Sequence, residues 1–171
     1  MTEPAMPEHK TVRNRLAIPY ITPSGVIGFT FRCIQDHNCA VAGHGKYKKP
    51  GLEATFYGVM DLFSDSLDIH VTEGEVDAIT LSEMCDLPAI GIPGATNWKP
   101  AWKEVLSDFR YVFVYCDGDS AGSGLGRKIE KEMGDNRAIL LTMPEGEDVN
   151  SMYLKYGPER LRNMAKVEGK K

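Results

Sequence analysis

The sequence predicts an α/β fold in which a mainly parallel sheet is flanked by helices and preceded by a small basic β-rich subdomain. Three acidic clusters, beginning at Glu73, Asp117 and Glu145, each follow a short apolar run that is typical of a buried strand. From Leu67 onward, such runs alternate with segments of helical periodicity, which is the pattern of a parallel sheet. Before Leu67, short apolar runs separated by turn formers indicate β structure.

Three regions are expected along the chain. A loose tail at residues 1–12 precedes a basic β-rich subdomain at residues 13–60. The α/β domain with its C-terminal helices follows at residues 61–171. A chain of 171 residues is long enough for one domain with a substantial core and a small appended lobe.

The β-rich subdomain should begin with a hairpin. Apolar runs at residues 16–20 and 26–34 lie on either side of residues 22–25, a cluster rich in turn formers. Residues 35–55 contain several glycines and lysines and are expected to form loops.

Helical periodicity predicts the helices of the α/β domain. The residues expected to face the core are Ala78, Leu81 and Cys85 in the first helix, Trp102, Val105, Leu106 and Phe109 in the second, and Ala121, Leu125, Ile129 and Met133 in the third. A last helix at residues 150–156 should end at Gly157 and Pro158, and a basic helix should follow it.

The charge is divided unevenly along the chain. The net charge is −4, which argues against a uniformly basic nucleic-acid-binding surface. Residues 1–52 carry +4, however, which leaves −8 for the remainder. Two interpretations are open: the basic part binds nucleic-acid phosphates while the acidic part binds metal, or both are ordinary solvated surfaces.

The sequence carries no apolar stretch of the roughly 20 residues needed to span a membrane, and the polar N-terminus lacks the pattern of a signal peptide. The four cysteines have no disulfide-framework spacing, which fits a reducing compartment. We therefore expect the protein in the cytoplasm, which is the host cytoplasm if a phage encodes it, without a membrane partner.

The acidic clusters predict a metal site. Loops at the carboxyl ends of parallel strands converge on one crevice, so carboxylates that are distant in sequence can meet there. Such a cluster repels itself unless it binds a cation, and Mg²⁺ takes one or two carboxylates together with substrate phosphates. This chemistry is typical of phosphoryl or nucleotidyl transfer.

Glu73, Asp117 and Asp119 are the principal candidates. Glu73 lies at a strand end, where Gly74 permits a tight turn and a close approach by phosphate. Asp117 and Asp119 flank Gly118, so both can point into one site. Capping of a helix N-terminus is the alternative for each aspartate.

Asp77 and Asp148 are weaker candidates for the same site, because each lies near the start of an expected helix, where capping is a sufficient explanation. Glu75, Glu145 and Glu147 are expected to be solvated neighbours of the site.

These acidic residues resemble a known motif. Glu73 and Gly74 with Asp77, followed about forty residues later by Asp117, Gly118 and Asp119, are similar to the signature of the TOPRIM domain, which primases, topoisomerases and some nucleases share.

The resemblance extends upstream to the basic subdomain of bacterial DnaG-type primases, and covers about residues 13–155. The upstream residues that carry it are Arg13–Tyr20, Gly25–Phe29, Arg32, Lys46, Tyr47 and Phe56–Val59. Asn150 stands where the bacterial enzymes usually carry a second aspartate, and this change resembles the primases of phage-type replication systems. Asp148 remains a candidate ligand.

The resemblance implies the catalytic core of a DNA primase, a nucleotidyltransferase that synthesises RNA primers on single-stranded DNA from ribonucleoside triphosphates during replication. It implies two divalent cations, Mg²⁺ or Mn²⁺, one at the primer 3′ hydroxyl and one at the incoming triphosphate. Glu73, Asp117 and Asp119 would be catalytic and, with Asp148 and Asp77, would bind the metal.

The resemblance also assigns nucleic-acid or nucleotide binding to the basic subdomain. The residues concerned are Arg13, Arg15, Arg32, Lys46, Tyr47 and Lys48. The alternative is that these cations only make the surface soluble. A replicative helicase or a separately encoded zinc-ribbon module would be the protein partner.

Complete DnaG-type primases also carry a zinc ribbon and a helicase-interacting region. Because no Cys/His ribbon precedes Arg13 and only a short basic tail follows Tyr156, we expect a core that extends a supplied primer more readily than it starts one.

Two other functions remain open. A TOPRIM nuclease would use the same metal site to cleave DNA or RNA, whereas Lys46 and Tyr47 favour the primase. A non-catalytic TOPRIM factor in recombination or assembly would bind DNA only, and the presence of Glu73, Asp117 and Asp119 argues against it.

No zinc is expected. The compact set Cys33, His37, Cys39 and His44 offers four zinc-competent side chains, but its spacing matches no common zinc module. Cys33 is interpreted as a packed cysteine instead. His70, on the first strand of the α/β domain, is likewise interpreted as a packed or edge histidine and not as a catalytic base.

Overall fold

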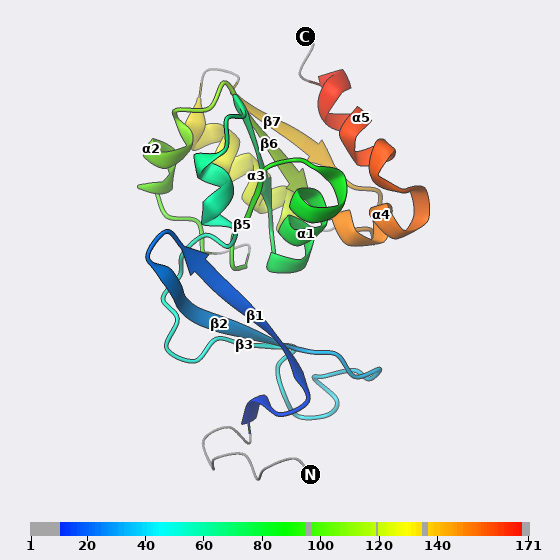
Figure 1. Cartoon of the computed structure of the whole chain (residues 1–171). Helices are drawn as coiled ribbons and strands as arrows, with labels where there is room; N and C mark the ends of the chain where they lie inside the picture. The colour runs from blue at the N-terminus through cyan, green and yellow to red at the C-terminus, as the bar shows by residue number, and fades with distance from the viewer. Residues whose placement is uncertain (1–10, 95–96, 119, 135–136, 169–171) are drawn as a thin grey trace. The chain divides into compact units, whose positions relative to one another are not determined.

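Figure 1 shows a computed structural model of the chain, in which residues 11–94, 97–118, 120–134 and 137–168 are described. The chain divides into two compact units, Met1–Glu53 and Ala54–Lys171. No helix within the described ranges has both the length and the apolar character needed to cross a membrane.

The first unit is built on a three-stranded antiparallel sheet in the order β1-β2-β3. Its strands are β1 (Arg15–Thr22), β2 (Gly25–Cys33) and β3 (Tyr47–Lys48). Thr22 pairs with Gly25 across a two-residue turn, and Gly25 has a φ of 108°, a conformation that favours glycine. The predicted hairpin is therefore confirmed.

The second unit contains a four-stranded parallel sheet in the order β5-β4-β6-β7. Its strands are β4 (Asp68–Thr72), β5 (Ala89–Gly91), β6 (Tyr111–Cys116) and β7 (Ala138–Thr142). This arrangement confirms the predicted α/β fold. Strand β5 was not predicted, because three residues are too few to show a periodicity.

Helices connect these strands and follow the last one. They are the 3₁₀-helix η2 (Val59–Phe63), α1 (Glu75–Ile79) with its π-helical continuation η3 (Thr80–Met84), α2 (Trp102–Leu106), α3 (Ser120–Met133), α4 (Val149–Tyr156) and α5 (Pro158–Glu168). Helix α4 ends at Gly157, whose φ is 73°, as the sequence predicts.

The core lies on both faces of the parallel sheet. Ile69 and Val114 belong to the cluster that α2 and α3 cover. Phe113 and Tyr115 belong to the cluster that α1, α4 and α5 cover. Alternate residues of β6 enter different clusters, and the four residues 69–72 of β4 are all buried, so both strands are buried on both faces, as in other parallel sheets.

The predicted inward faces of the helices are largely observed. Leu125, Ile129 and Met133 of α3 are buried, whereas the side chain of Ala121 lies outside the described ones. Val105 was predicted to be buried and is 44% exposed. The reason is that α2 is only five residues long, and Trp102 and Leu106, four positions apart, occupy its buried side.

His70 is a packed histidine, as the sequence predicts. Its ring stacks on Phe113 with a centroid distance of 5.2 Å, and its Nδ1 lies 3.2 Å from the Tyr115 hydroxyl. Burial lowers the pKa of His70 to about 4. The ring is therefore neutral at neutral pH and contributes to the core.

Three loops meet at the carboxyl ends of β4, β6 and β7. The Asp117 backbone N–H donates to Glu73 Oε1 at 3.2 Å. The Gly118 N–H donates to the Glu147 carbonyl at 2.9 Å, and the Gly146 N–H donates to the Gly118 carbonyl at 3.2 Å. The parallel sheet thus brings the three acidic segments together, as its topology requires.

The contact between the second and third loops depends on Gly118. A Cβ at this position would lie 1.9 Å from the Pro144 carbonyl oxygen. Only glycine permits this approach of two backbones.

We expect Gly118→Ala to lower the free energy of unfolding by about 1–3 kcal/mol, because the added methyl group must push the two loops apart. Gly124→Ala is the matched control, since no atom lies within 4 Å of a Cβ added there. In a helix this change should be neutral or stabilising by up to about 1 kcal/mol. Urea denaturation measures both, and equal stability of the two variants would contradict the close approach.

Candidate active site

Glu73 and Asp117 lie together at the carboxyl edge of the parallel sheet. Glu73 directly follows β4 and Asp117 directly follows β6, and these strands are neighbours. The hydrogen bond from the Asp117 N–H fixes the Glu73 carboxylate at the start of the loop that carries Asp117. Asp119, the third principal candidate, lies outside the described residues.

The local electrostatics are those of an acidic site. Cys116, the last residue of β6 and the residue before Asp117, is buried. Burial, followed by the negative charges of Glu73 and Asp117, raises the pKa of the Cys116 thiol to about 11. The thiol therefore stays neutral and adds no charge to the site.

Asp77 bridges two helices in the structure. Its Oδ1 accepts a hydrogen bond from the Asn150 N–H at 3.0 Å, which ties α1 to the first turn of α4. The Asn150 side chain faces the same helices, since its Oδ1 accepts from the Thr80 hydroxyl at 3.3 Å.

Asp148 is the N-cap of α4. Its Oδ1 accepts from the Ser151 N–H at 2.6 Å, while the Ser151 hydroxyl accepts from the Asp148 N–H at 3.0 Å. This reciprocal pair is a capping box with serine at the N3 position. Asp148 therefore has the helix-capping contacts that the sequence left open as its alternative role.

Glu75 corrects one expectation. It was expected to be solvated, but it is only 3% exposed, in the first turn of α1. A carboxylate is favourable at this end of a helix, because the N-terminal N–H groups carry partial positive charge.

The carboxylate pair fits a divalent cation chemically. Mg²⁺ and Mn²⁺ prefer hard oxygen ligands, and Mg²⁺ sites commonly use one or two carboxylates with substrate phosphates and water. Glu73 and Asp117 offer such ligands at the sheet edge, where the Asp117 backbone contacts the Glu73 carboxylate. A cation held there could bind a phosphate group of a nucleotide.

The first unit contains a basic cavity of about 390 Å³. Its lining residues are Thr11, Arg13, Asn14, Arg15, Cys33, Gln35, His44 and Lys48. The Arg15 guanidinium donates to the carbonyls of Gly45 and Lys46, each at 3.1 Å, and is thereby held in place.

Arg32 and Tyr47 form a second basic feature, on β2 and β3. The guanidinium carbon of Arg32 lies 6.0 Å from the centroid of the Tyr47 ring. Its Nε is buried and has no hydrogen-bond partner among the described residues. Lys46, next to Tyr47, is exposed.

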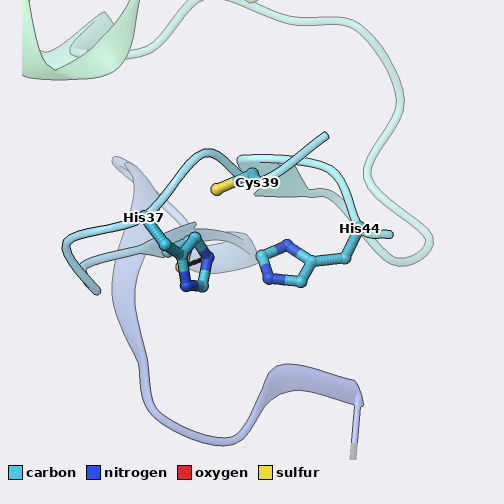
Figure 2. Close-up of side chains that lie close together, drawn as sticks. His37, Cys39 and His44 are labelled. Atoms are coloured by element: carbon cyan, nitrogen blue, oxygen red, sulfur yellow. Dashed lines mark hydrogen bonds between the residues drawn. The ribbon is translucent and has the colours of Figure 1, made fainter. Parts of the chain in front are cut away.

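The expectation of no zinc is wrong. The structure gathers Cys33, His37, Cys39 and His44 so that one potential ligand atom from each lies within 4.8 Å of the others. Figure 2 shows His37, Cys39 and His44 close together on the loop that follows β2. The sequence argument compared spacing with known modules, whereas the folding of the loop decides which ligands meet.

The chain has relatives among known proteins, although no protein-family model matches it. It is 37% identical over 155 residues to the Gene 57 protein of Mycobacterium phage D29, a match that covers 87% of this chain and 96% of that protein. It is 24% identical over 130 residues to the Twinkle homolog protein, chloroplastic/mitochondrial, of Arabidopsis thaliana, covering 62% of this chain and 18% of that protein.

Solved primase structures share the fold. A DNA primase domain from Pseudomonas aeruginosa has a TM-score of 0.73 at 23% identity and matches 91% of this chain and 51% of its own. The DnaG catalytic core and the DnaG primase catalytic domain bound to ssDNA each have a TM-score of 0.73, at 21% and 22% identity, and each match covers 90% of this chain and 53% of the other.

The chain thus spans about half of the length of these primase structures. The likeness confirms the resemblance to DnaG-type primases that the acidic motif and the basic subdomain carry. The chain belongs to the family of the phage Gene 57 protein, and it has the TOPRIM-type fold of a DnaG-type primase catalytic core.

Proposed function

We propose that the chain is the catalytic core of a DNA primase that transfers ribonucleotides in a metal-dependent reaction on single-stranded DNA. The observation that carries the proposal is the pairing of Glu73 with Asp117 at adjacent strand ends within the DnaG-type fold. The solved primase structures that share the fold support the same class of reaction.

Glu73 and Asp117 would hold a divalent cation, and Asp119 joins them in the proposal on its sequence position. Such a cation, when bound, supplies positive charge for the phosphates and for the primer 3′ hydroxyl. The Asp117 N–H keeps the Glu73 carboxylate oriented before substrate arrives. Gly118, which has no side chain, lets the Pro144 carbonyl approach the loop that carries Asp117.

The basic unit would bind the template or the nucleotide through phosphates. Arg13, Arg15 and Lys48 line one cavity, where three cations favour a polyanion. The buried Nε of Arg32 offers a donor beside Tyr47, whose ring can stack on a base or a sugar. A solved DnaG primase domain with bound ssDNA supports this partner for the present chain.

The proposal is tested by template-dependent incorporation of labelled ribonucleotides onto a primer annealed to single-stranded DNA, with Mg²⁺ or Mn²⁺. We expect Glu73→Gln and Asp117→Asn to lower incorporation by about 100-fold or more, because each removes charge from the cation site. Glu145→Gln is the control, since Glu145 is exposed in a neighbouring loop.

Two results would contradict the proposal. Near wild-type incorporation by Glu73→Gln or Asp117→Asn would remove these residues from the reaction. Cleavage of the single strand, without incorporation and with the same dependence on Glu73 and Asp117, would identify a nuclease instead.

A second prediction concerns the cations. We expect Arg32→Ala and Lys46→Ala to weaken single-stranded DNA binding, with the larger loss at low salt, because phosphate contacts release counterions. The slope of log K against log salt should become less steep by about 0.7 for each phosphate that the variant no longer neutralises. Lys103→Ala, an exposed change on α2, is the control. Fluorescence anisotropy at several salt concentrations measures the slope, and slopes equal to wild type would exclude these phosphate contacts.

A further inference from the structure

We propose that the first unit carries a tetrahedral zinc site with two thiolate and two imidazole ligands. The ligands are Cys33, His37, Cys39 and His44, together termed the loop site. The ion would fasten the loop between β2 and β3 to the end of β2. This inference is independent of the proposed primase activity.

The distances at the loop site agree with tetrahedral zinc. Zn–S bonds of about 2.3 Å and Zn–N bonds of about 2.0–2.1 Å place neighbouring sulfur and nitrogen ligands about 3.6 Å apart. The observed distance from Cys33 Sγ to His37 Nε2 is 3.6 Å. Since all four ligand atoms lie within 4.8 Å of one another, the longest separation needs to shorten by only about 1 Å to complete the tetrahedron.

The donor types select the metal. Two thiolates with two imidazoles suit zinc, whereas Mg²⁺ and Ca²⁺ require oxygen ligands. Both cysteines at the site are free thiols. The loop site therefore differs in kind from the carboxylate pair, and the two sites would take different ions.

His44 also has a suitable outer contact. Its Nδ1 lies 3.1 Å from the Gly45 carbonyl oxygen. In the tautomer that donates a proton from Nδ1 to this carbonyl, Nε2 keeps its lone pair for a metal, which is the usual arrangement of metal-bound histidine. Arg15 Nη2, at 3.1 Å from Nδ1, would then turn away from the ring and keep its carbonyl partners through Nη1.

Hydrogen bonds hold the loop, but it has no apolar core of its own. No residue from 34 to 46 is buried, and its two largest apolar side chains, Ile34 and Val41, are 64% and 86% exposed. Strand β3 has only two residues, and the Cys33 N–H adds one bond to the Lys46 carbonyl, at 2.8 Å. Because a structural metal can supply the folding energy that a missing apolar core cannot, an ion at the loop site accounts for this fold.

The ligands also lie at both ends of the loop. Cys33 is the last residue of β2, and His44 lies three residues before β3. Both line the basic cavity. An ion that joins them would fix the wall of that cavity.

The test measures the metal directly. The full chain is expressed in zinc-supplemented medium, purified with a non-chelating reductant, and analysed by atomic emission. We expect one zinc per chain, and exchange with Co²⁺ should give the visible absorption of tetrahedral cobalt with thiolate ligands. Cys39→Ser and the double variant Cys33→Ser/Cys39→Ser should lose both signals, whereas Val41→Ser, in the same loop, should retain both.

Hydrogen exchange keeps the test informative if a cysteine variant fails to fold. Chelation of zinc from the unmutated chain should speed amide exchange at residues 34–46 and leave the parallel sheet of the second unit unchanged. The proposal is overturned if the chain contains no zinc and gives no tetrahedral cobalt spectrum, if the double variant retains the metal, or if chelation leaves exchange at residues 34–46 unaltered.

Discussion

The parallel pairing of β4 with β6 is the constraint on which the candidate active site depends. Both strands are buried on both faces, and a slip of one residue would move packed side chains such as Ile69 and Phe113 to the opposite face of the sheet, where a different core packs. The loops after these strands must then begin at the same edge. The Glu73 carboxylate is thereby kept beside the Asp117 backbone, and the proposed cation site rests on this contact.

Much of this arrangement could be predicted from the sequence, because strands that are buried on both faces appear as apolar runs and their loops converge by topology. The sequence could not predict the exposure of Val105 or the burial of Glu75, since each depends on how a five-residue helix packs against the sheet. Asp77 and Asp148 show a further limit. The sequence predicts that each of these aspartates lies near the start of a helix, but only the structure shows which backbone groups they contact.

The loop site shows the opposite failure, in which the right residues were recognised and set aside. Their spacing fits no common zinc module, yet the turn of residues 34–46 brings two thiols and two imidazoles within reach of one ion. The two units thus carry different donor chemistry, oxygen ligands at the sheet edge and sulfur with nitrogen in the loop. The two proposed ions would therefore not compete for the same ligands.

The most direct test of the central claim is crystallographic. Crystals soaked with MnCl₂ and measured above the manganese absorption edge locate the ion by its anomalous scattering. The account predicts a peak within coordination distance of the carboxylates of both Glu73 and Asp117. A manganese peak elsewhere on the chain, with none at this pair, would contradict it.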